Sequence, residues 1–196
     1  NATAVNDAGL TFAASTVGGN LSATATTGNM TDSGALTITG TSSFTTSANN
    51  ADIILNNNNA FTGAVALNTT GSSGRAKIDN GTTALILAAS SVGGNLNVRS
   101  GNSITDSGTV TVGQAFSATT DANNGVINLD QLAINNGIHL RTHGNGNATA
   151  VNDAGFLFGG SGSTVGGNLS ATATTGNMTD NNDGSVTVAG TSSFTT

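Results

Sequence analysis

The chain has 196 residues, of which 36% are hydrophobic and only 7% charged, and its formal net charge at pH 7 is −6. An ordinary soluble domain carries about 25% charged residues and a nucleic-acid-binding protein presents a basic surface, so this composition excludes nucleic acid as an expected partner. No apolar run approaches the roughly 18 residues of a membrane span, and none is expected here.

Short segments in which apolar and polar residues alternate follow one another along the chain. They include NLSATAT, ALTITG, ADIILN, GAVALN and NLNVRS, separated by turn-forming runs such as TTGN, TDSG and NNNN. A period of two is typical of half-buried β-strands. The pattern predicts one continuous core that contains Leu21, Leu36, Ile53, Val65, Leu96, Ile127 and Ile138. It places Thr24, Thr37, Asn97 and Arg99 on the outside.

The absence of proline and cysteine fits a continuous β structure. Because proline removes a backbone N–H donor, a chain without it suits a backbone that is paired almost everywhere. Without cysteine, neither a disulfide framework nor a thiolate metal site can form, so packing and strand pairing must supply the stability.

The sequence repeats itself at long range. Residues 15–32 recur unchanged at 163–180, a looser copy lies at 90–106, and residues 147–196 retrace residues 1–46. Equivalent residues such as Leu10 and Leu85 define half-repeats of about 75 residues, roughly 1–75, 76–150 and a partial 151–196. Such self-similarity is typical of solenoids, in which each unit buries its apolar face against the next. We interpret residues 1–196 as one solenoid segment, expected to come from the interior of a longer array.

The local period selects the kind of solenoid. Apolar residues do not recur at helical spacing, and the predicted strands are too short and too numerous for βαβ units. An all-β fold remains. We predict a right-handed parallel β-helix with three to four coils per half-repeat. Six glycines lie just before predicted strands, where a corner requires either positive φ or close backbone approach. They are Gly18, Gly19, Gly93, Gly94, Gly166 and Gly167.

The run VGGNLNVRSGNSITDSGTVTVGQAFSATTDANNGVINL carries a family resemblance. It resembles the haemagglutinin-type repeats of filamentous-haemagglutinin-like adhesins, giant bacterial surface proteins exported by two-partner secretion. The resemblance implies an extracellular, secreted shaft at the bacterial cell surface or in a biofilm matrix. Host or matrix glycans are possible partners. Self-association, end to end or lateral, is also expected, because a solenoid segment exposes unpaired coil edges at both ends. The secretion domain of that family bears an Asn-Pro motif, which this proline-free chain lacks.

Three alternating residues in GIHLRTHG are candidate binding residues. His139, Arg141 and His143 project from one face of a predicted strand, where a metal ion or an anionic sugar could bind. The equivalent residues of the preceding half-repeat, Ala66, Asn68 and Thr70, are neutral, which favours ordinary solvent-facing positions. Arg75 and Lys77 are likewise interpreted as a solvated pair.

The recurring Asp32, Asp106 and Asp180 are weak candidates for a calcium site. Carboxylate oxygens are suitable ligands, but the calcium-binding nonapeptide is absent, and an aspartate that caps its own turn is the simpler interpretation. No metal and no cofactor are therefore expected.

The remaining alternatives are an enzyme and an ice-binding protein. A polysaccharide-acting enzyme needs a cluster of acids and bases in a groove, and four basic residues without Glu, Tyr or Cys supply little for one. An ice-binding face needs Thr pairs on every coil, whereas Thr24 and Thr26 are replaced by Asn97 and Arg99. The sequence thus favours a non-enzymatic structural shaft over a carbohydrate- or calcium-binding module. Loss of residues 76–150 is expected to shorten it by three or four rungs.

Overall fold

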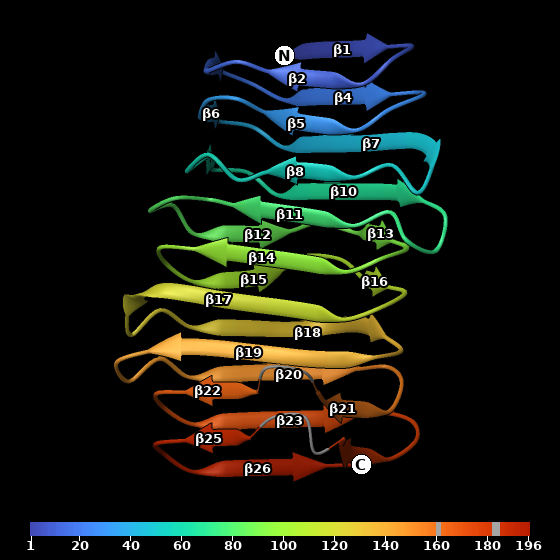
Figure 1. Ribbon diagram of the computed structural model, residues 1–196. Helices are drawn as coiled ribbons and strands as arrows, with labels where there is room; N and C mark the ends of the chain where they lie inside the picture. The colour runs from blue at the N-terminus through green and yellow to red at the C-terminus, as the bar shows by residue number, and fades with distance from the viewer. Residues whose placement is uncertain (160–161, 182–184) are drawn as a thin grey trace.

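The computed structural model describes residues 1–159, 162–181 and 185–196, and these form an all-β parallel solenoid (Figure 1). The solenoid has about nine turns of about 21 residues, and the described ranges contain no helix. The predicted fold class is therefore confirmed. None of the described segments is a helix long and apolar enough to cross a membrane.

The strands form three sheets. The 12-stranded sheet contains β1 (Ala2–Asn6), β4 (Leu21–Ala25), β7 (Ser42–Asn49), β10 (Val65–Thr70), β12 (Leu85–Leu87), β13 (Ser90–Val92), β15 (Ile104–Asp106), β16 (Val110–Val112), β18 (Ile127–Ile134), β20 (Ala148–Asn152), β23 (Leu169–Ala173) and β26 (Ser192–Thr195). The 11-stranded sheet contains β2 (Leu10–Phe12), β5 (Met30–Asp32), β8 (Ile53–Leu55), β11 (Ala76–Asp79), β14 (Leu96–Ser100), β17 (Phe116–Asn123), β19 (Gly137–His143), β21 (Phe156–Phe158), β22 (Ser163–Val165), β24 (Met178–Asp180) and β25 (Val186–Val188). The 3-stranded sheet contains β3 (Ser15–Val17), β6 (Leu36–Ile38) and β9 (Ala60–Phe61).

The half-repeat does not contain a whole number of turns. Leu21 begins β4 in the 12-stranded sheet, its copy Leu96 begins β14 in the 11-stranded sheet, and the next copy, Leu169, begins β23 back in the 12-stranded sheet. The path from β4 to β23 crosses seven turns. The true period is therefore a 148-residue repeat of seven turns, and each half-repeat advances the rod by about three and a half turns onto the opposite face.

The alternation of strand types explains this half-turn. Most turns combine one longer strand, such as β4, with a bent pair of short strands, such as β5 and β6. In the first half-repeat the longer strands β10 and β11 follow each other directly. In the second, β17 to β20 do so, with β18, which pairs with both β15 and β16, in the place of a short pair. The half-repeat from β4 to β13 then has seven sides, an odd number, so the next copy begins on the other face. The expected three or four coils per half-repeat become three and a half.

One core runs through the whole rod. All seven residues predicted to lie inside are buried in a single apolar cluster, whereas Thr37, Asn97 and Arg99 are exposed and Thr24 is partly exposed. Phe44 packs edge-on between Phe12 and Phe61, with ring centroids 6.3 and 5.6 Å away. Such edge-to-face stacking adds to the stability that burial of the rings supplies. The predicted alternation is confirmed.

The repeated Gly-Gly-Asn sequence couples neighbouring turns. The side-chain oxygen of Asn20 accepts the backbone N–H of Thr41 one turn later, at 3.0 Å. Asn95 and Asn168 accept the N–H groups of Ala115 and Thr191 in the same way, at 3.0 and 2.9 Å. Each asparagine thus satisfies a corner N–H that the strand ladder leaves unpaired, which is why the motif recurs.

Close approach, rather than positive φ, explains the corner glycines. None of the six has positive φ. A Cβ at Gly93 or Gly166 would overlap the carbonyl oxygen of Gly71 or Gly144 on the preceding turn, and Gly19, Gly94 and Gly167 are similarly crowded. Gly18 lies in the first turn and has nothing within 4 Å. The sequence predicted either positive φ or close backbone approach at these corners. The structure shows close approach at five of the six glycines.

Candidate functional site: a charged strip on one face

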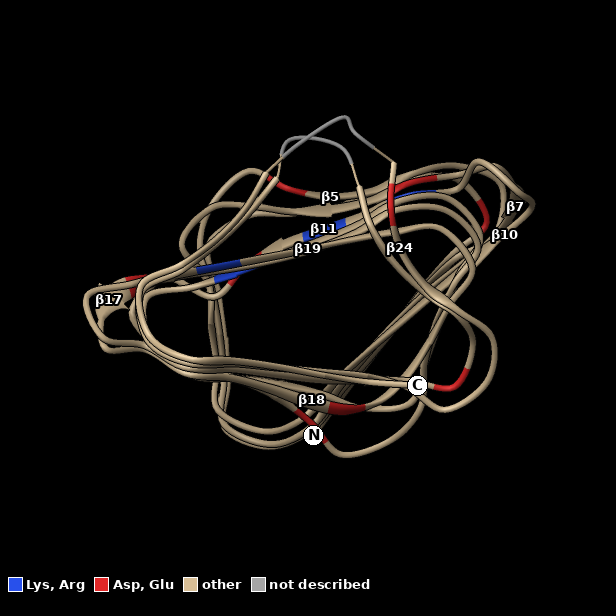
Figure 2. Cartoon of the chain, turned by 90° about the horizontal axis from the view of Figure 1, so that it is seen from below, with Lys and Arg blue, Asp and Glu red and all other residues tan. Residues whose placement is uncertain are grey.

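All four basic residues lie on or directly beside the 11-stranded sheet. Lys77, Arg99 and Arg141 project from the outer face of β11, β14 and β19, and Arg75 immediately precedes β11. Figure 2 shows the basic residues gathered on this side of the cross-section. We define the charged strip as Lys77, Asp79, Arg99, Asp121, Arg141 and His143.

Strand register brings the members of the strip together. Asp79, Arg99, Thr119 and Arg141 are successive partners across β11, β14, β17 and β19. Parallel strands are about 4.8 Å apart, so Arg99 and Arg141 are separated by about 10 Å with the short Thr119 side chain between them. A shallow groove lined by Lys77, Arg99, Thr119, Arg141, His143 and other residues results.

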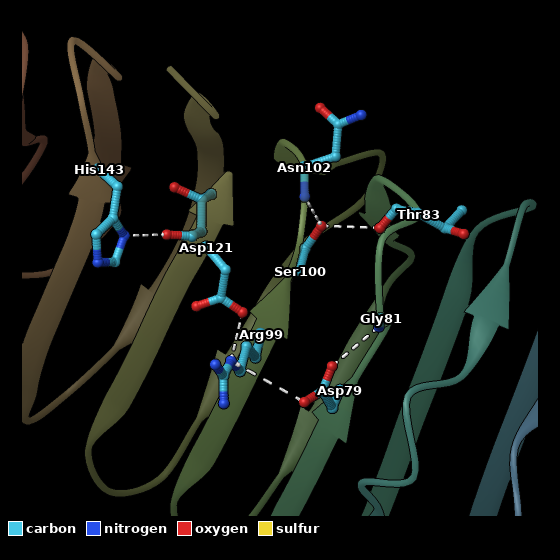
Figure 3. A network of polar contacts seen from close by, with 9 residues as sticks. Asp79, Gly81, Thr83, Arg99, Ser100, Asn102, Asp121 and His143 are labelled. Atoms are coloured by element: carbon cyan, nitrogen blue, oxygen red, sulfur yellow. Dashed lines mark hydrogen bonds and ion pairs between the residues drawn. The ribbon is translucent and has the colours of Figure 1, made fainter. Parts of the chain in front are cut away.

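Arg99 is held by two carboxylates (Figure 3). Its Nε lies 2.5 Å from Oδ2 of Asp121 and 4.0 Å from Oδ2 of Asp79. The hydrogen bond and the charge of Asp121 raise the pKa of Arg99 above its ordinary value, and Asp79 adds to this. Arg75 is paired in the same manner with Asp52, at 2.9 Å. These two guanidinium groups are therefore largely neutralised by neighbours within the rod.

Lys77 and Arg141 differ from the other two cations. Both are exposed, and neither makes an ion pair with another described residue. The strip as a whole has three cations and two carboxylates, which leaves one excess positive charge on a chain of net charge −6. Lys77 and Arg141 are thus the groups available to an external anion.

The neighbouring half-repeats show that the solenoid does not require these charges. The strand AKID of β11 corresponds to ATAV of β1, and LNVRS of β14 corresponds to LSATA of β4. The positions of Lys77, Arg99 and Arg141 are thereby occupied by Thr3, Thr24 and Asn68. Threonine and asparagine occupy the same positions in equivalent strands, so these strands form without the charges.

His139 corrects one prediction. We expected His139, Arg141 and His143 to be solvent-facing, and Arg141 and His143 are exposed, but His139 is only 9% exposed. A hydrogen bond with the backbone of Gly162 accompanies this burial, and the Nδ1 atom of His139 has no partner in the described part of the chain. Burial lowers the pKa of His139, and the charge of Arg141 lowers it further. The three side chains share a strand face, but they do not converge on one ligand.

His143 is anchored by the rod itself. Its Nδ1 lies 2.6 Å from the carbonyl oxygen of Thr120 one turn earlier (Figure 3). That contact directs the ring toward Thr120 and leaves it at the edge of the groove. Nowhere in the described ranges do three His, Cys, Asp or Glu side chains form an arrangement that could hold a metal ion.

The recurrent aspartates cap the following turn rather than their own. Asp32 is buried, and its carboxylate accepts the N–H groups of Asn56 and Asn57 and the side-chain amides of Asn57 and Asn59. These donors occupy the oxygens that a cation would need.

Asp106 repeats this arrangement one half-repeat later, where it accepts the N–H groups of Asp130 and Gln131. Burial raises the pKa of Asp106, while those two N–H groups favour its charged form. Asp180 ends β24, is exposed and also takes part in an interaction. The prediction of a turn cap thus describes Asp32 and Asp106, with the cap extending between turns.

Comparison with known proteins identifies a family. A family model described as repeats of unknown function (DUF5649) matches residues 1–68, 73–145 and 145–196. The chain belongs to this family. The three DUF5649 matches follow one another at nearly the interval at which the structure changes face. No curated protein and no solved structure matches the chain.

Sequence reasoning missed the central part of the strip. It singled out Arg141 and His143 but treated Arg99 as an ordinary outward residue and did not consider Asp79 or Asp121. The signal was the strand register, since Asp79 and Arg99 share a column, and Asp121 lies within reach of Arg99, only when each turn has the observed length. No local motif carries that information.

Proposed function

We propose that this DUF5649 chain is a stretch of the structural shaft of a giant extracellular bacterial adhesin or filament. The shaft would hold a distant tip or matrix-binding region away from the cell surface. This proposal rests on the resemblance to filamentous-haemagglutinin-like repeats and on the architecture of the rod.

One observation supports a shaft most strongly. Equivalent segments of successive half-repeats, such as those that begin at Leu21 and Leu96, lie on opposite faces of the rod while the same core continues through both. A protein with a unique site would place that site on one face, and a copy moved to the other face would not preserve it. A shaft requires only that the core and the strand ladders continue, which any copy provides in either orientation.

Length is therefore the property expected to matter. Seven turns at about 4.8 Å give each 148-residue repeat about 34 Å of rod. Additional repeats make the rod longer, and each added repeat forms the same core and strand-pairing contacts as the existing ones.

Two experiments test the proposal. Antibodies raised against the recombinant chain should label intact cells that produce the parent protein. In addition, insertion of a second copy of residues 21–168 into the parent should move a tip epitope about 34 Å farther from the cell, as measured by immunoelectron microscopy. Absence of surface labelling, with the protein detected inside cells, would contradict an extracellular shaft.

A further inference from the structure

Two opposite faces of the rod carry complementary charge. The charged strip lies on the 11-stranded sheet, whereas Asp130 and Asp153 lie on the side of the 12-stranded sheet, at β18 and just after β20. Figure 2 shows β18 across the cross-section from β11 and β19. Both aspartates are exposed and line one shallow hollow with Gln131 and Val151. Because every Lys and Arg is on the strip side, no cation of the chain neutralises this acidic pair.

Only one end of the strip shares its turns with the acidic pair: Arg141 and His143 lie on β19, whereas Lys77 lies on β11, three strands earlier in the sheet and about 14 Å away along the rod. The strands β17, β18, β19 and β20 follow one another directly, with β17 and β19 on the strip face and β18 and β20 on the acidic face. Asp130, like Lys77 and Arg141, is also specific to this part of the rod. Its counterpart in the preceding half-repeat is the neutral Asn56, which receives the same cap from Asp32 that Asp130 receives from Asp106.

We propose that the charged strip of one rod docks laterally on the acidic pair of a second copy of this chain. Lys77 and Arg141, which have no ion-pair partner within the rod, would face Asp130 and Asp153 of the neighbour. Lys77 and Arg141 lie about 14 Å apart along the rod, whereas Asp130 and Asp153 lie about 5 Å apart, so the long side chains of Lys77 and Arg141 would converge on the acidic pair of the neighbour. The inference goes beyond the proposed shaft and does not depend on it.

A second copy fits these observations better than an acidic polysaccharide does. A glycan would engage Lys77 and Arg141 and leave the acidic pair on the opposite face without a role. The chain also contains no Tyr or Trp, the residues best suited to stacking on sugar rings while donating a hydrogen bond. The one exposed large aromatic side chain of the described residues is Phe194, in the last strand and away from the strip.

The contact is heterologous, and this determines the assembly. The strip of one copy meets the acidic pair of the next, which leaves each docked rod with an open strip or an open acidic pair. Such contacts do not close into a dimer but extend into sheets of parallel rods. Exposed ion pairs contribute only about 0.2–1 kcal/mol each, so a single contact is weak, and many in register along a long array act together.

Charge exchange tests the proposal. One variant of the full chain carries Lys77→Glu and Arg141→Glu, and a second carries Asp130→Lys and Asp153→Lys. In the first both faces are acidic, and in the second both are basic, so neither should self-associate through this contact. Mixed together, the two variants offer opposite charges again and should restore association. Light scattering and sedimentation velocity at low and high ionic strength provide the readout.

Neutral variants and a matched control accompany these reversals. Lys77→Thr with Arg141→Asn introduces the residues that the neighbouring half-repeats already carry, so folding should be unaffected. Loss of two exposed pairs should weaken lateral association about tenfold. Asp7→Asn, in the first turn and outside the contact, also changes a surface charge, by +1 rather than −2, and should have no such effect. Any association that persists in all variants is attributed to end-to-end pairing, because β1 and β26 are the edge strands of the 12-stranded sheet and have unpaired backbone N–H and C=O groups.

The outcomes separate the alternatives. Salt-sensitive association of the wild-type chain, lost in each reversal and restored in the mixture, supports the proposal. If the wild-type chain shows no salt-sensitive attraction, or if the mixture behaves like the separate variants, the proposal is wrong. Binding of dextran sulfate through Lys77 and Arg141 without self-association would instead make the strip a polyanion site.

Discussion

The buried Asn152 provides the sharpest test of how neighbouring turns are held together. It is fully buried, its side-chain oxygen accepts the N–H of Ile134 at 2.8 Å, and its amide donates to the carbonyl oxygens of Ile134 and Gly155 at 2.8 and 2.7 Å. Asn152→Leu keeps a similar volume but removes all three bonds. One buried N–H then has no acceptor and two carbonyls lose a donor, which should lower the free energy of unfolding by about 3–5 kcal/mol.

The chain contains its own control for this substitution. Asn6 occupies the equivalent place in the repeated sequence ATAVNDAG, but it is partly exposed and makes one side-chain bond, to the carbonyl oxygen of Gly9. Asn6→Leu should therefore cost only about 0.5–1.5 kcal/mol. Urea denaturation followed by far-UV circular dichroism measures both variants, and hydrogen exchange at the Ile134 amide reports the local effect. Equal destabilisation by the two substitutions, or unchanged exchange at Ile134, would refute the reasoning.

Three further predictions concern the rod as a whole. Asp32→Asn should destabilise the chain by about 1–3 kcal/mol because its carboxylate accepts four hydrogen bonds, whereas Asp7→Asn should have little effect in the same thermal melts. Because burial lowers the pKa of His139, the folded state resists protonation, so stability should be full above about pH 6.5 and fall as the pH decreases toward the folded pKa. His139→Ala should flatten that dependence in pH-resolved denaturation; a slope unchanged by His139→Ala would count against burial as its cause. Duplication of residues 21–168 should lengthen the particle seen by small-angle X-ray scattering by about 34 Å, and a compact, two-lobed particle would disagree with a continuous solenoid.

The sequence by itself determined the class of fold and its core. A period of two in the apolar residues, turn residues between the strands and long-range copies are local or directly comparable features. They specify which side chains point inward regardless of how the turns are arranged. Leu21, Leu96 and Ile138 were therefore correctly placed inside, and the recurring Gly-Gly-Asn was correctly interpreted as a feature of the corners.

Only the tertiary structure decided which face each segment occupies. Successive strands of the 12-stranded sheet are offset by 19 residues between β1 and β4 and by 23 between β7 and β10. Local alternation does not reveal these turn lengths, because any offset that keeps apolar residues inside satisfies it. The half-turn that separates Leu21 from Leu96 follows from the sum of these lengths. The same sum places Arg99 beside Asp79 and Asp121, and sets Lys77 and Arg141 opposite the acidic face.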